Sequence, residues 1–439
     1  MDGFVGRVEE LRYLNSVYQK APVSCAVCGR RHLGKTALIK QFCKDKNHIY
    51  LSGMDGLRED NLAEISHAIS EYSGKGVIID DIEDLFPMLK KICAKKPVVV
   101  VIDRYSDLVE NFPQFTSYLR AFMNRDINST KMMLIVCDTD NSLFGRFYYT
   151  LDVKAMTYRD CMGFHPTYSP VQQLMAYSTI GGTPAYHRMF KGDPLEVIRR
   201  QFFDHMSVFS LEVESMVNSE TTLRTACSKV LAAMAAGAES LKDIIARSEL
   251  SVAVCTRAVE DLEHKGMILK EVSSGPSKRS VYSIHSNILR FFYEVVNRYT
   301  HQMEFDSPEA AHERAKKDID NYFEKSFKSV CMDYITLNYK YSFVGKLRKR
   351  DDSKDDVVDF VAAVVENDVN RTAVSVCRLY GDRLGKEDYD ALVNRSRSIA
   401  GSNRIYMMFS GAGFSPELKD MAEKDRNIRL ISLDDIYRQ

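Results

Sequence analysis

The sequence predicts an α/β protein that begins with a mostly parallel sheet and ends with a second, smaller α/β unit. Short runs of large aliphatic residues alternate with helical patterns before residue 157, and such alternation returns after residue 305. Between these two parts the pattern is almost wholly helical. At about 150 residues per domain, the 439 residues are sufficient for about three domains.

The first part, residues 1–157, contains three recognisable strands and is interpreted as one core domain. Val23 to Val27 is a β-branched run that stops at Gly29, after which a helical pattern begins. Val98 to Ile102 is an unbroken aliphatic run, which is typical of a parallel strand buried on both faces. A third strand is predicted at Met132 to Val136.

The middle of the chain predicts two helical units. Residues 158–217 show amphipathic helical patterns and are interpreted as a helical lid. Residues 218–300 contain three helical patterns, the second capped by Ser240 and the third by Ser251, followed by two β-like runs around a turn at 273–276. Three helices and a hairpin are the pattern of a winged helix-turn-helix.

The last part, residues 305–439, predicts a second α/β domain. Ser307 is the expected N-cap of a long amphipathic helix with Pro308 as its first residue. Further strands are predicted at Val357–Val365, Ala373–Leu379 and Arg404–Phe409, with a helix before the last.

Composition narrows the class of protein. The 60 Lys and Arg residues balance 60 Asp and Glu residues, so contact with nucleic acid requires a local basic face. The ten cysteines are too sparse for a secreted disulfide scaffold. No apolar run approaches the roughly 18 residues of a membrane span, and the N-terminus lacks the features of a signal peptide. We therefore expect a cytoplasmic protein without membrane contact.

One motif predicts nucleotide binding. The segment Gly29-Arg30-Arg31-His32-Leu33-Gly34-Lys35-Thr36 matches GxxxxGK[ST] and lies between a predicted strand and a predicted helix. In such a P-loop, backbone N–H groups face a phosphate, the lysine reaches the β- and γ-phosphates, and the hydroxyl coordinates Mg²⁺. We expect this loop, with Ala37 after it, to bind ATP and Mg²⁺, with Lys35 as the catalytic lysine and Thr36 as a metal ligand.

A second metal-holding acid is predicted at Asp103, directly after the strand that ends at Ile102. Hydrolysing ATPases of this kind usually carry Glu next, to polarise the attacking water. Here the residue is Arg104, and a guanidinium cannot act as a base. We therefore expect ATP binding with weak or conditional hydrolysis, with Asp107 or Glu110 as alternative acids.

A competing position for that acid-bearing strand is Val77 to Asp81. Its acids, Asp80 and Asp81, suit the capping of the helix that contains Leu85 and Leu89 better than they suit a metal site.

The opening Phe4-Val5-Gly6-Arg7, followed by Glu10-Leu11, resembles the FxGRxxEL start of the archaeal ATPase family. These are STAND-type relatives of the AAA+ ATPases, and their P-loop often reads GRRxxGKT. The resemblance continues at Gly145-Arg146, at 181–186 and at 289–293, and so covers nearly the whole chain.

The resemblance implies roles for several residues. Phe4, Gly6 and Arg7 would lie near the adenine and ribose, Thr139 would sense the γ-phosphate, and Arg146 would be an arginine finger or sensor. Simpler alternatives are that Phe4 is a core residue, that Arg7 pairs with Glu10, and that Arg146 is a surface cation. The family's usual Gly-Ser before the sensor is Asp138-Thr139 here.

In the same family the C-terminal domain resembles the restriction-endonuclease fold, in which an Asp and an ExK motif hold Mg²⁺. Asp359 matches the Asp, but the ExK position reads Val376-Cys377-Arg378, so a carboxylate and the lysine are missing. We expect a degenerate nuclease fold. Glu324 and Glu366 are candidate replacements without the motif spacing.

The winged helix is expected to contact either DNA or a protein partner. Its third helix mixes acidic with basic residues and has no basic stripe, whereas Lys270, Lys278 and Arg279 cluster in the wing. The sequence thus predicts an ATP-dependent switch, with a DNA-binding regulator or an ATP-dependent nuclease as the alternatives.

Overall fold

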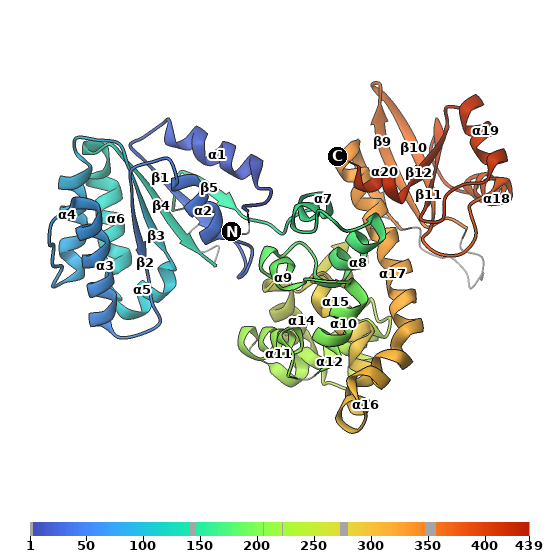
Figure 1. The fold of residues 1–439 in the computed structure, drawn as a ribbon, viewed down its shortest axis with the longest axis horizontal. Coiled ribbons are helices and arrows are strands. Elements are labelled where there is room, and N and C mark those ends of the chain that lie inside the picture. Colours follow the sequence, from blue (N-terminus) through green and yellow to red (C-terminus); the bar gives the residue numbers. More distant parts are fainter. Residues whose placement is uncertain are drawn as a thin grey trace. The chain divides into compact units, whose positions relative to one another are not determined.

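The computed structural model describes residues 3–139, 146–204, 206–221, 223–272, 280–346 and 357–438. These residues form two compact units (Figure 1). The N-terminal unit contains the residues up to Phe164 together with Gly182–Arg188, and the C-terminal unit contains His165–Gly181 and the residues from Met189 onward. The segment Gly182–Arg188 therefore packs with the first unit although the residues on both sides of it belong to the second.

The N-terminal unit is built on a five-stranded sheet in the order β2-β3-β4-β1-β5, in which every neighbouring pair is parallel. Its strands are β1 (Val23–Cys28), β2 (His48–Ser52), β3 (Val98–Asp103), β4 (Met132–Asp138) and β5 (Tyr149–Asp152). The three predicted strands are present as β1, β3 and β4. The sequence analysis missed β2 and β5, which lie at the edges of the sheet, where short strands need no continuous apolar run.

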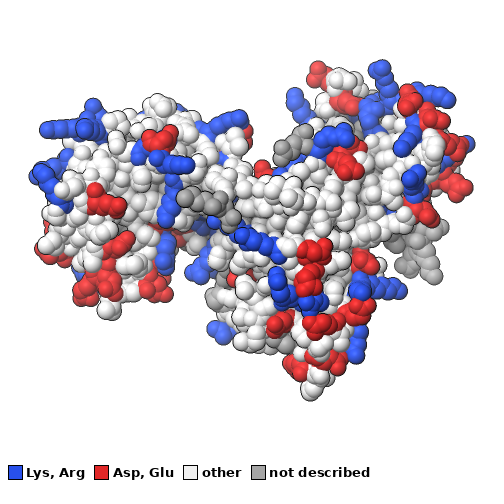
Figure 2. All heavy atoms as spheres, in the orientation of Figure 1, with Lys and Arg blue, Asp and Glu red and all other residues white. Residues whose placement is uncertain are grey.

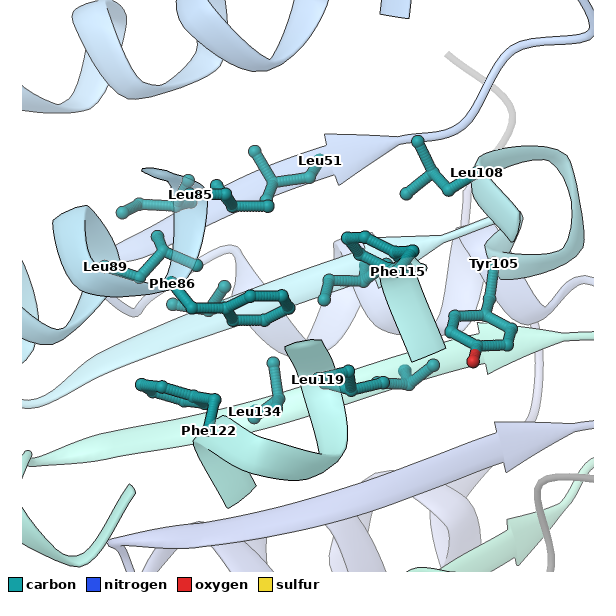
Figure 3. Packing of buried hydrophobic residues seen from close by; sticks show 14 of the residues in the cluster. Leu51, Leu85, Phe86, Leu89, Tyr105, Leu108, Phe115, Leu119, Phe122 and Leu134 are labelled. Atoms are coloured by element: carbon teal, nitrogen blue, oxygen red, sulfur yellow. The ribbon is translucent and has the colours of Figure 1, made fainter. Parts of the chain in front are cut away.

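Helices cover both faces of this sheet. They are α1 (Val8–Tyr18), α2 (Lys35–Cys43), α3 (Arg58–Ser73), α4 (Leu85–Cys93), α5 (Tyr105–Asn111) and α6 (Phe115–Arg125). One face packs against α1 and α2, and the other packs against α3 to α6. Figure 3 shows the second face, where Phe86 stacks on Phe122 with ring centroids 5.3 Å apart and Leu51 and Leu134 project from the strands.

The segment Val77 to Asp81 lies outside every strand, and Ile78 is 79% exposed. Asp81 accepts a hydrogen bond from the Glu83 N–H and caps the short helix η1 (Ile82–Asp84). The competing position for the metal-holding acid is therefore a capping segment.

The C-terminal unit begins with the helices α8 (Pro170–Ile180), α10 (Pro194–Phe202) and α11 (Val208–Glu220). The three helices α12 (Arg224–Ala235), α13 (Leu241–Ser248) and α14 (Val252–His264) and a two-stranded hairpin follow them. The helices between this hairpin and the last sheet are α15 (Asn287–Glu294), α16 (Thr300–Phe305) and α17 (Pro308–Asn338). The hairpin pairs β6 (Ile268–Val272) with β7 (Ser280–Ile284). Ser240 and Ser251 accept hydrogen bonds from the first turns of α13 and α14, as the sequence predicts.

A second five-stranded sheet completes this unit, in the order β12-β11-β10-β9-β8. Its strands are β8 (Lys340–Gly345), β9 (Phe360–Glu366), β10 (Val369–Arg378), β11 (Arg404–Ser410) and β12 (Ile428–Ser432). Strands β8, β9 and β10 are antiparallel, whereas β10, β11 and β12 are parallel. The apolar cluster under α18 (Lys386–Ser396) and α19 (Pro416–Lys424) includes Leu392 and Leu418, which pack on this sheet. The sequence analysis missed β8 and β12, which are again the edge strands.

Candidate nucleotide-binding site

The P-loop backbone adopts positive φ angles at its glycines. Gly29 has φ +147°, and a Cβ at this position would lie 2.4 Å from the Val153 carbonyl oxygen. Gly34 has φ +83° and His32 has φ 65°. Only glycine fits at position 29, because both the backbone angle and the close approach of Val153 exclude a side chain.

Lys35 is folded back onto the loop that it follows. Its Nζ donates to the carbonyl oxygens of Gly29 at 2.5 Å and Arg30 at 2.8 Å, and the side chain is only 9% exposed. Burial lowers the pKa of Lys35, although the nearby groups Cys137 and Asp103 oppose this shift. A bound phosphate would give this buried ammonium a charged partner in place of two neutral carbonyls.

The two metal-holding residues predicted from the sequence meet in the structure. The Thr36 hydroxyl donates to Asp103 Oδ2 at 2.8 Å, although the two residues lie 67 positions apart. Asp103 ends β3 and is 4% exposed. Both groups offer oxygen atoms, which are the ligands that Mg²⁺ prefers.

A tyrosine that the sequence analysis did not identify also holds Asp103. The Tyr50 hydroxyl donates to Asp103 Oδ2 at 2.6 Å, and the Arg104 N–H donates to Oδ1 at 2.9 Å. Burial, together with the Asp103 charge, raises the pKa of Tyr50, so this phenol stays protonated. Only the adjacency of β2 and β3 brings Tyr50 here, and no motif in the sequence marks it.

Asp138 is a second acid at the end of the sheet that carries the P-loop, and the sequence analysis did not predict it as a site residue. It ends β4 and accepts hydrogen bonds from Ser106 N at 2.7 Å and Ser106 Oγ at 2.6 Å. Thr139, the expected γ-phosphate sensor, follows it and is exposed, with its N–H donating to Asp138 Oδ1 at 2.5 Å. The structure therefore places Thr139 at the P-loop edge, and its sensing role stays a prediction.

Arg104 stands where a catalytic glutamate is usual, and it is the N-cap of α5 with φ 54°. Its side chain is 53% exposed and lies 2.5 Å from Asp107 Oδ2. Glu110 is exposed on the same helix. Of the two alternative acids, Asp107 is engaged with the cation at position 104.

The N-terminal segment is attached to the P-loop through Arg7. This residue is 7% exposed, and it donates to the Leu33 carbonyl at 2.9 Å and to Glu10 at 2.6 Å. Phe4 packs at the edge of the core that covers β1, and Gly6 has φ +66° beside Met156. The simpler alternatives for Phe4 and Arg7 are therefore present, and contact with adenine or ribose stays a prediction.

The remaining P-loop residues divide by exposure. Leu33 is buried, Arg30, Gly34 and Ala37 are half-buried, and Arg31, His32 and Thr36 are exposed. The segment Gly182–Arg188 reaches this loop, since Pro184 lies 3.6 Å from the position of a Gly34 Cβ and the rings of His32 and Tyr186 are 6.1 Å apart. The Met156 N–H also donates to the Gly182 carbonyl at 2.8 Å.

Arg146 lies away from this site within the chain. It is exposed and precedes β5, which runs parallel to β1. The P-loop follows the end of β1. Arg146, which precedes the parallel strand β5, therefore lies toward the end at which these strands begin. Its role as an arginine finger or sensor stays a prediction.

In the C-terminal sheet, Asp359 has a lysine partner that the sequence analysis did not name. Lys328 Nζ donates to Asp359 Oδ1 at 2.5 Å, and the Cys377 N–H donates to Oδ2 at 2.6 Å. Burial lowers the pKa of Lys328, but its hydrogen bond and charge attraction to Asp359 outweigh burial and raise the pKa overall. The only sequence signal is that Lys328 lies one helical turn after Glu324 on α17.

The other residues expected from the nuclease resemblance have structural partners. Val376 packs against the apolar cluster under α18, and Arg378 pairs with Asp388 at 2.5 Å. Glu366 is held by Arg371 and Arg429, at 2.7 and 2.9 Å. Glu324 accepts from the Leu379 and Tyr380 N–H groups, at 3.0 and 3.1 Å.

The predicted DNA-contacting wing is described only in part. Lys270 is exposed on β6, with its Nζ 5.7 Å from the Tyr282 ring centroid. Lys278, Arg279 and the turn at 273–276 lie outside the described residues. Contact with DNA or a protein through this unit stays a prediction.

The parallel five-stranded sheet, the glycine-bearing loop after β1 and the acid at the end of β3 define the N-terminal unit as a P-loop NTPase domain. Residues 4–165 match a family described as an ATPase domain predominantly from Archaea. The N-terminal domain therefore matches the archaeal ATPase family that the opening motif predicts.

Similarity to other proteins extends further along the chain. An uncharacterized protein of Methanocaldococcus jannaschii is 24% identical over 440 residues, which cover 90% of this chain and 92% of that protein. A Walker-type ATPase of Pyrococcus abyssi is 15% identical, with a TM-score of 0.49 over 66% of this chain and 96% of that one. The Orc1 protein of Aeropyrum pernix, solved with DNA, is 13% identical, with a TM-score of 0.36 over 69% of this chain and 95% of that one.

Among the described residues, no helix has the length and apolar character needed to cross a membrane.

Proposed function

We propose that this protein binds ATP with Mg²⁺ and acts as a nucleotide-dependent switch with weak or conditional hydrolysis. The hydrogen bond from Thr36 to Asp103, at 2.8 Å, carries the proposal. It joins the residue that follows the P-loop lysine to the acid of a separate strand, which is the pair that P-loop enzymes use at the metal. When bound there, Mg²⁺ would neutralise phosphate charge, with Thr36 and Asp103 holding it directly or through water.

The weak-hydrolysis part of the proposal rests on Arg104. A guanidinium does not lose its proton in a protein, so it cannot activate water. Asp107, the nearest acid on α5, is paired with this cation. The site thus supports nucleotide binding without supplying an evident base for hydrolysis.

The switch part rests on the segment Gly182–Arg188. It contacts the P-loop through Pro184, and it is covalently continuous with α8, which ends at Ile180. In the C-terminal unit, α8 is joined to later helices: Asn287 Nδ2 donates to the Tyr177 carbonyl at 2.9 Å, and Tyr322 OH donates to the Ser178 carbonyl at 2.7 Å. A change at the P-loop that moves Pro184 would therefore be transmitted to α8, α15 and α17.

The ATP-binding part is tested by thermal melts with and without ATP and Mg²⁺. A ligand at 100 times its Kd stabilises the native state by about 2.7 kcal/mol, so the midpoint must rise. Asp103→Asn should lose the added effect of Mg²⁺ and keep the melting temperature of the free protein. An unchanged midpoint for the natural protein at millimolar ATP would overturn the proposal.

We propose that the C-terminal sheet is a degenerate nuclease fold kept for binding or scaffolding. Phosphodiester cleavage needs a metal held by several oxygen ligands, whereas Asp359 is neutralised by Lys328 at 2.5 Å. Supercoiled DNA incubated with the protein and Mg²⁺ or Mn²⁺, with and without ATP, should stay intact. Cleavage that disappears in Asp359→Ala would contradict this proposal.

A further inference from the structure

A group of cations lies near the starts of β3 and β4, at the end of the strands opposite the P-loop. The nucleotide site does not use these cations. We call this group the basic edge. It consists of Lys90, Lys91, Lys95, Lys96, Arg120, Arg125 and Lys131. All seven residues are exposed. They lie in two stretches, 86–99 and 118–132, which contain one acid, Asp126.

Backbone and side-chain contacts bring the two stretches together. The Lys131 N–H donates to the Cys93 carbonyl at 2.8 Å, and Val98 is the strand partner of Met132. Lys90 and Asp126 form an ion pair at 2.6 Å. The two stretches are therefore joined at the ends of α4 and α6 and along the loops that lead into β3 and β4.

Stabilisation of the helix ends explains the presence of only some of these cations. Lys90, Lys91 and Arg125 lie in the last turns of their helices, where cations favourably meet the negative helix end. Lys95, Lys96 and Lys131 lie in loops, where the helix dipole gives no such reason. In a protein whose formal charges sum to zero, this local excess of six positive charges favours contact with a partner of opposite sign.

We propose that the basic edge binds the phosphate backbone of a nucleic acid, without reading its sequence. Lysine and arginine side chains are the usual contacts to phosphate oxygens, and Asn128 and Ser129 add exposed polar groups between Arg125 and Lys131. Both stretches are fully described, and none of the large exposed apolar side chains lies in them. A membrane surface is thereby disfavoured, because stable binding there takes apolar insertion in addition to charge.

The basic edge is a better phosphate surface than the described part of the three-helix and hairpin segment. From Ser251 to Val272 the chain has three cations, Arg257, Lys265 and Lys270, against four acids, Glu260, Asp261, Glu263 and Glu271. The upper left of the N-terminal unit in Figure 2 shows several Lys and Arg side chains on one surface. The basic edge therefore carries a larger excess of cations than the described part of that segment.

The basic edge and the nucleotide site lie at opposite ends of the same strands. β3 begins at Val98 beside the basic edge and ends at Asp103, and a strand of six residues is about 20 Å long. Variants of the basic edge should therefore leave ATP binding unchanged, so the failure of this inference is distinguishable from the failure of the proposed nucleotide site.

The test is fluorescence anisotropy of the full chain with labelled 30-base-pair duplex DNA and duplex RNA between about 50 and 200 mM salt. Each phosphate contact adds about −0.9 to the slope of log K against log salt for duplex DNA. Lys95→Ala/Lys96→Ala should reduce the steepness of that slope by about 2 and weaken binding at least tenfold at low salt. The ratio of DNA to RNA affinity identifies which backbone is the natural ligand.

The matched control is Lys419→Ala/Lys424→Ala on α19, where exposed lysines alternate with Glu417, Asp420 and Glu423. This control should bind DNA and RNA as the natural protein does. The inference is overturned by absence of binding to both duplexes at low salt, or by equal losses in the two double variants. It is also overturned if anionic phosphatidylserine vesicles bind more tightly than either duplex and lose that binding in Lys95→Ala/Lys96→Ala.

Discussion

The two α/β sheets of this protein each hold a buried acid next to a central strand, and the partners of these acids differ in charge. Asp103, at the end of β3, accepts hydrogen bonds from the hydroxyls of Thr36 and Tyr50. Asp359, just before β9, accepts from the Lys328 ammonium and from a backbone N–H. Uncharged donors orient Asp103 and leave its negative charge for a cation, whereas Lys328 cancels the charge of Asp359.

The comparison shows that an acid at the right place in a sheet does not by itself make a metal site. The Asp103 residue is 4% exposed, and the side chain of Asp359 is 6% exposed. Taking a carboxylate out of water is unfavourable unless a partner compensates for it. In the N-terminal unit, a bound cation would supply part of the stabilisation of the Asp103 charge. In the C-terminal unit, Lys328 of the protein itself stabilises the Asp359 charge.

The largest expected effect is the loss of nucleotide affinity in Lys35→Ala. Lys35 is the buried cation of the P-loop, and hydrogen bonds from a charged group contribute about 1.5–3 kcal/mol each. We expect ATP affinity to fall about 100-fold in a calorimetric titration. The fold should survive, because the hydrogen bonds of this side chain go to loop carbonyls. Lys44→Ala, an exposed lysine after α2, is the control, and unchanged ATP binding in Lys35→Ala would refute the site.

The next effect is on stability, in Asp359→Ala. This change leaves the Lys328 ammonium and the Cys377 N–H without their acceptor, and we expect the free energy of unfolding to fall by about 2–3 kcal/mol. Hydrogen exchange of the β9 and β10 amides should report the loss locally. In the double variant with Lys328→Ala the two losses should not add, because each single change breaks the same pair.

The exposed Asp420 on α19 provides the control for this stability change. Asp420→Ala should alter stability by less than about 0.5 kcal/mol. Full additivity of Lys328→Ala and Asp359→Ala would show that the pair contributes nothing as a pair, and the contrast with Asp103 would then fail.

Sequence reasoning found the acids and missed most of their partners. The P-loop and the buried strand before Asp103 follow from local patterns, because glycine spacing and an aliphatic run are visible along the chain. Tyr50 and Lys328 contact these acids only through strand adjacency and helix packing, and no spacing rule connects residues 50 and 103 or 328 and 359. The edge strands β2, β5, β8 and β12 were missed for a related reason, since they are short and partly solvent-facing.

A third, smaller effect concerns hydrolysis. We expect the natural protein to hydrolyse ATP slowly and Arg104→Glu to do so at least tenfold faster, because the new carboxylate supplies a base beside Asp103 and frees Asp107 from its ion pair. Arg104→Ala separates removal of the cation from addition of the base. Phosphate release is the measurement. Turnover on the order of 1 s⁻¹ or more in the natural protein would show that another acid already serves.

The smallest expected effect tests whether the uncharged donors to Asp103 orient its carboxylate for binding a cation. Tyr50→Phe removes one hydrogen bond of 2.6 Å to Asp103 Oδ2 and keeps the ring that packs against the core between α2 and the sheet. Such a bond contributes about 1 kcal/mol, so the Mg²⁺-dependent part of ATP affinity should fall about fivefold, while binding without Mg²⁺ stays the same. Burial raises the pKa of Tyr50, so the phenol remains a donor and this difference should be constant from about pH 6 to 9. A loss of equal size with and without Mg²⁺ would mean that Tyr50 supports only the fold, and Asp103 would then owe its orientation to Thr36 and the Arg104 N–H alone.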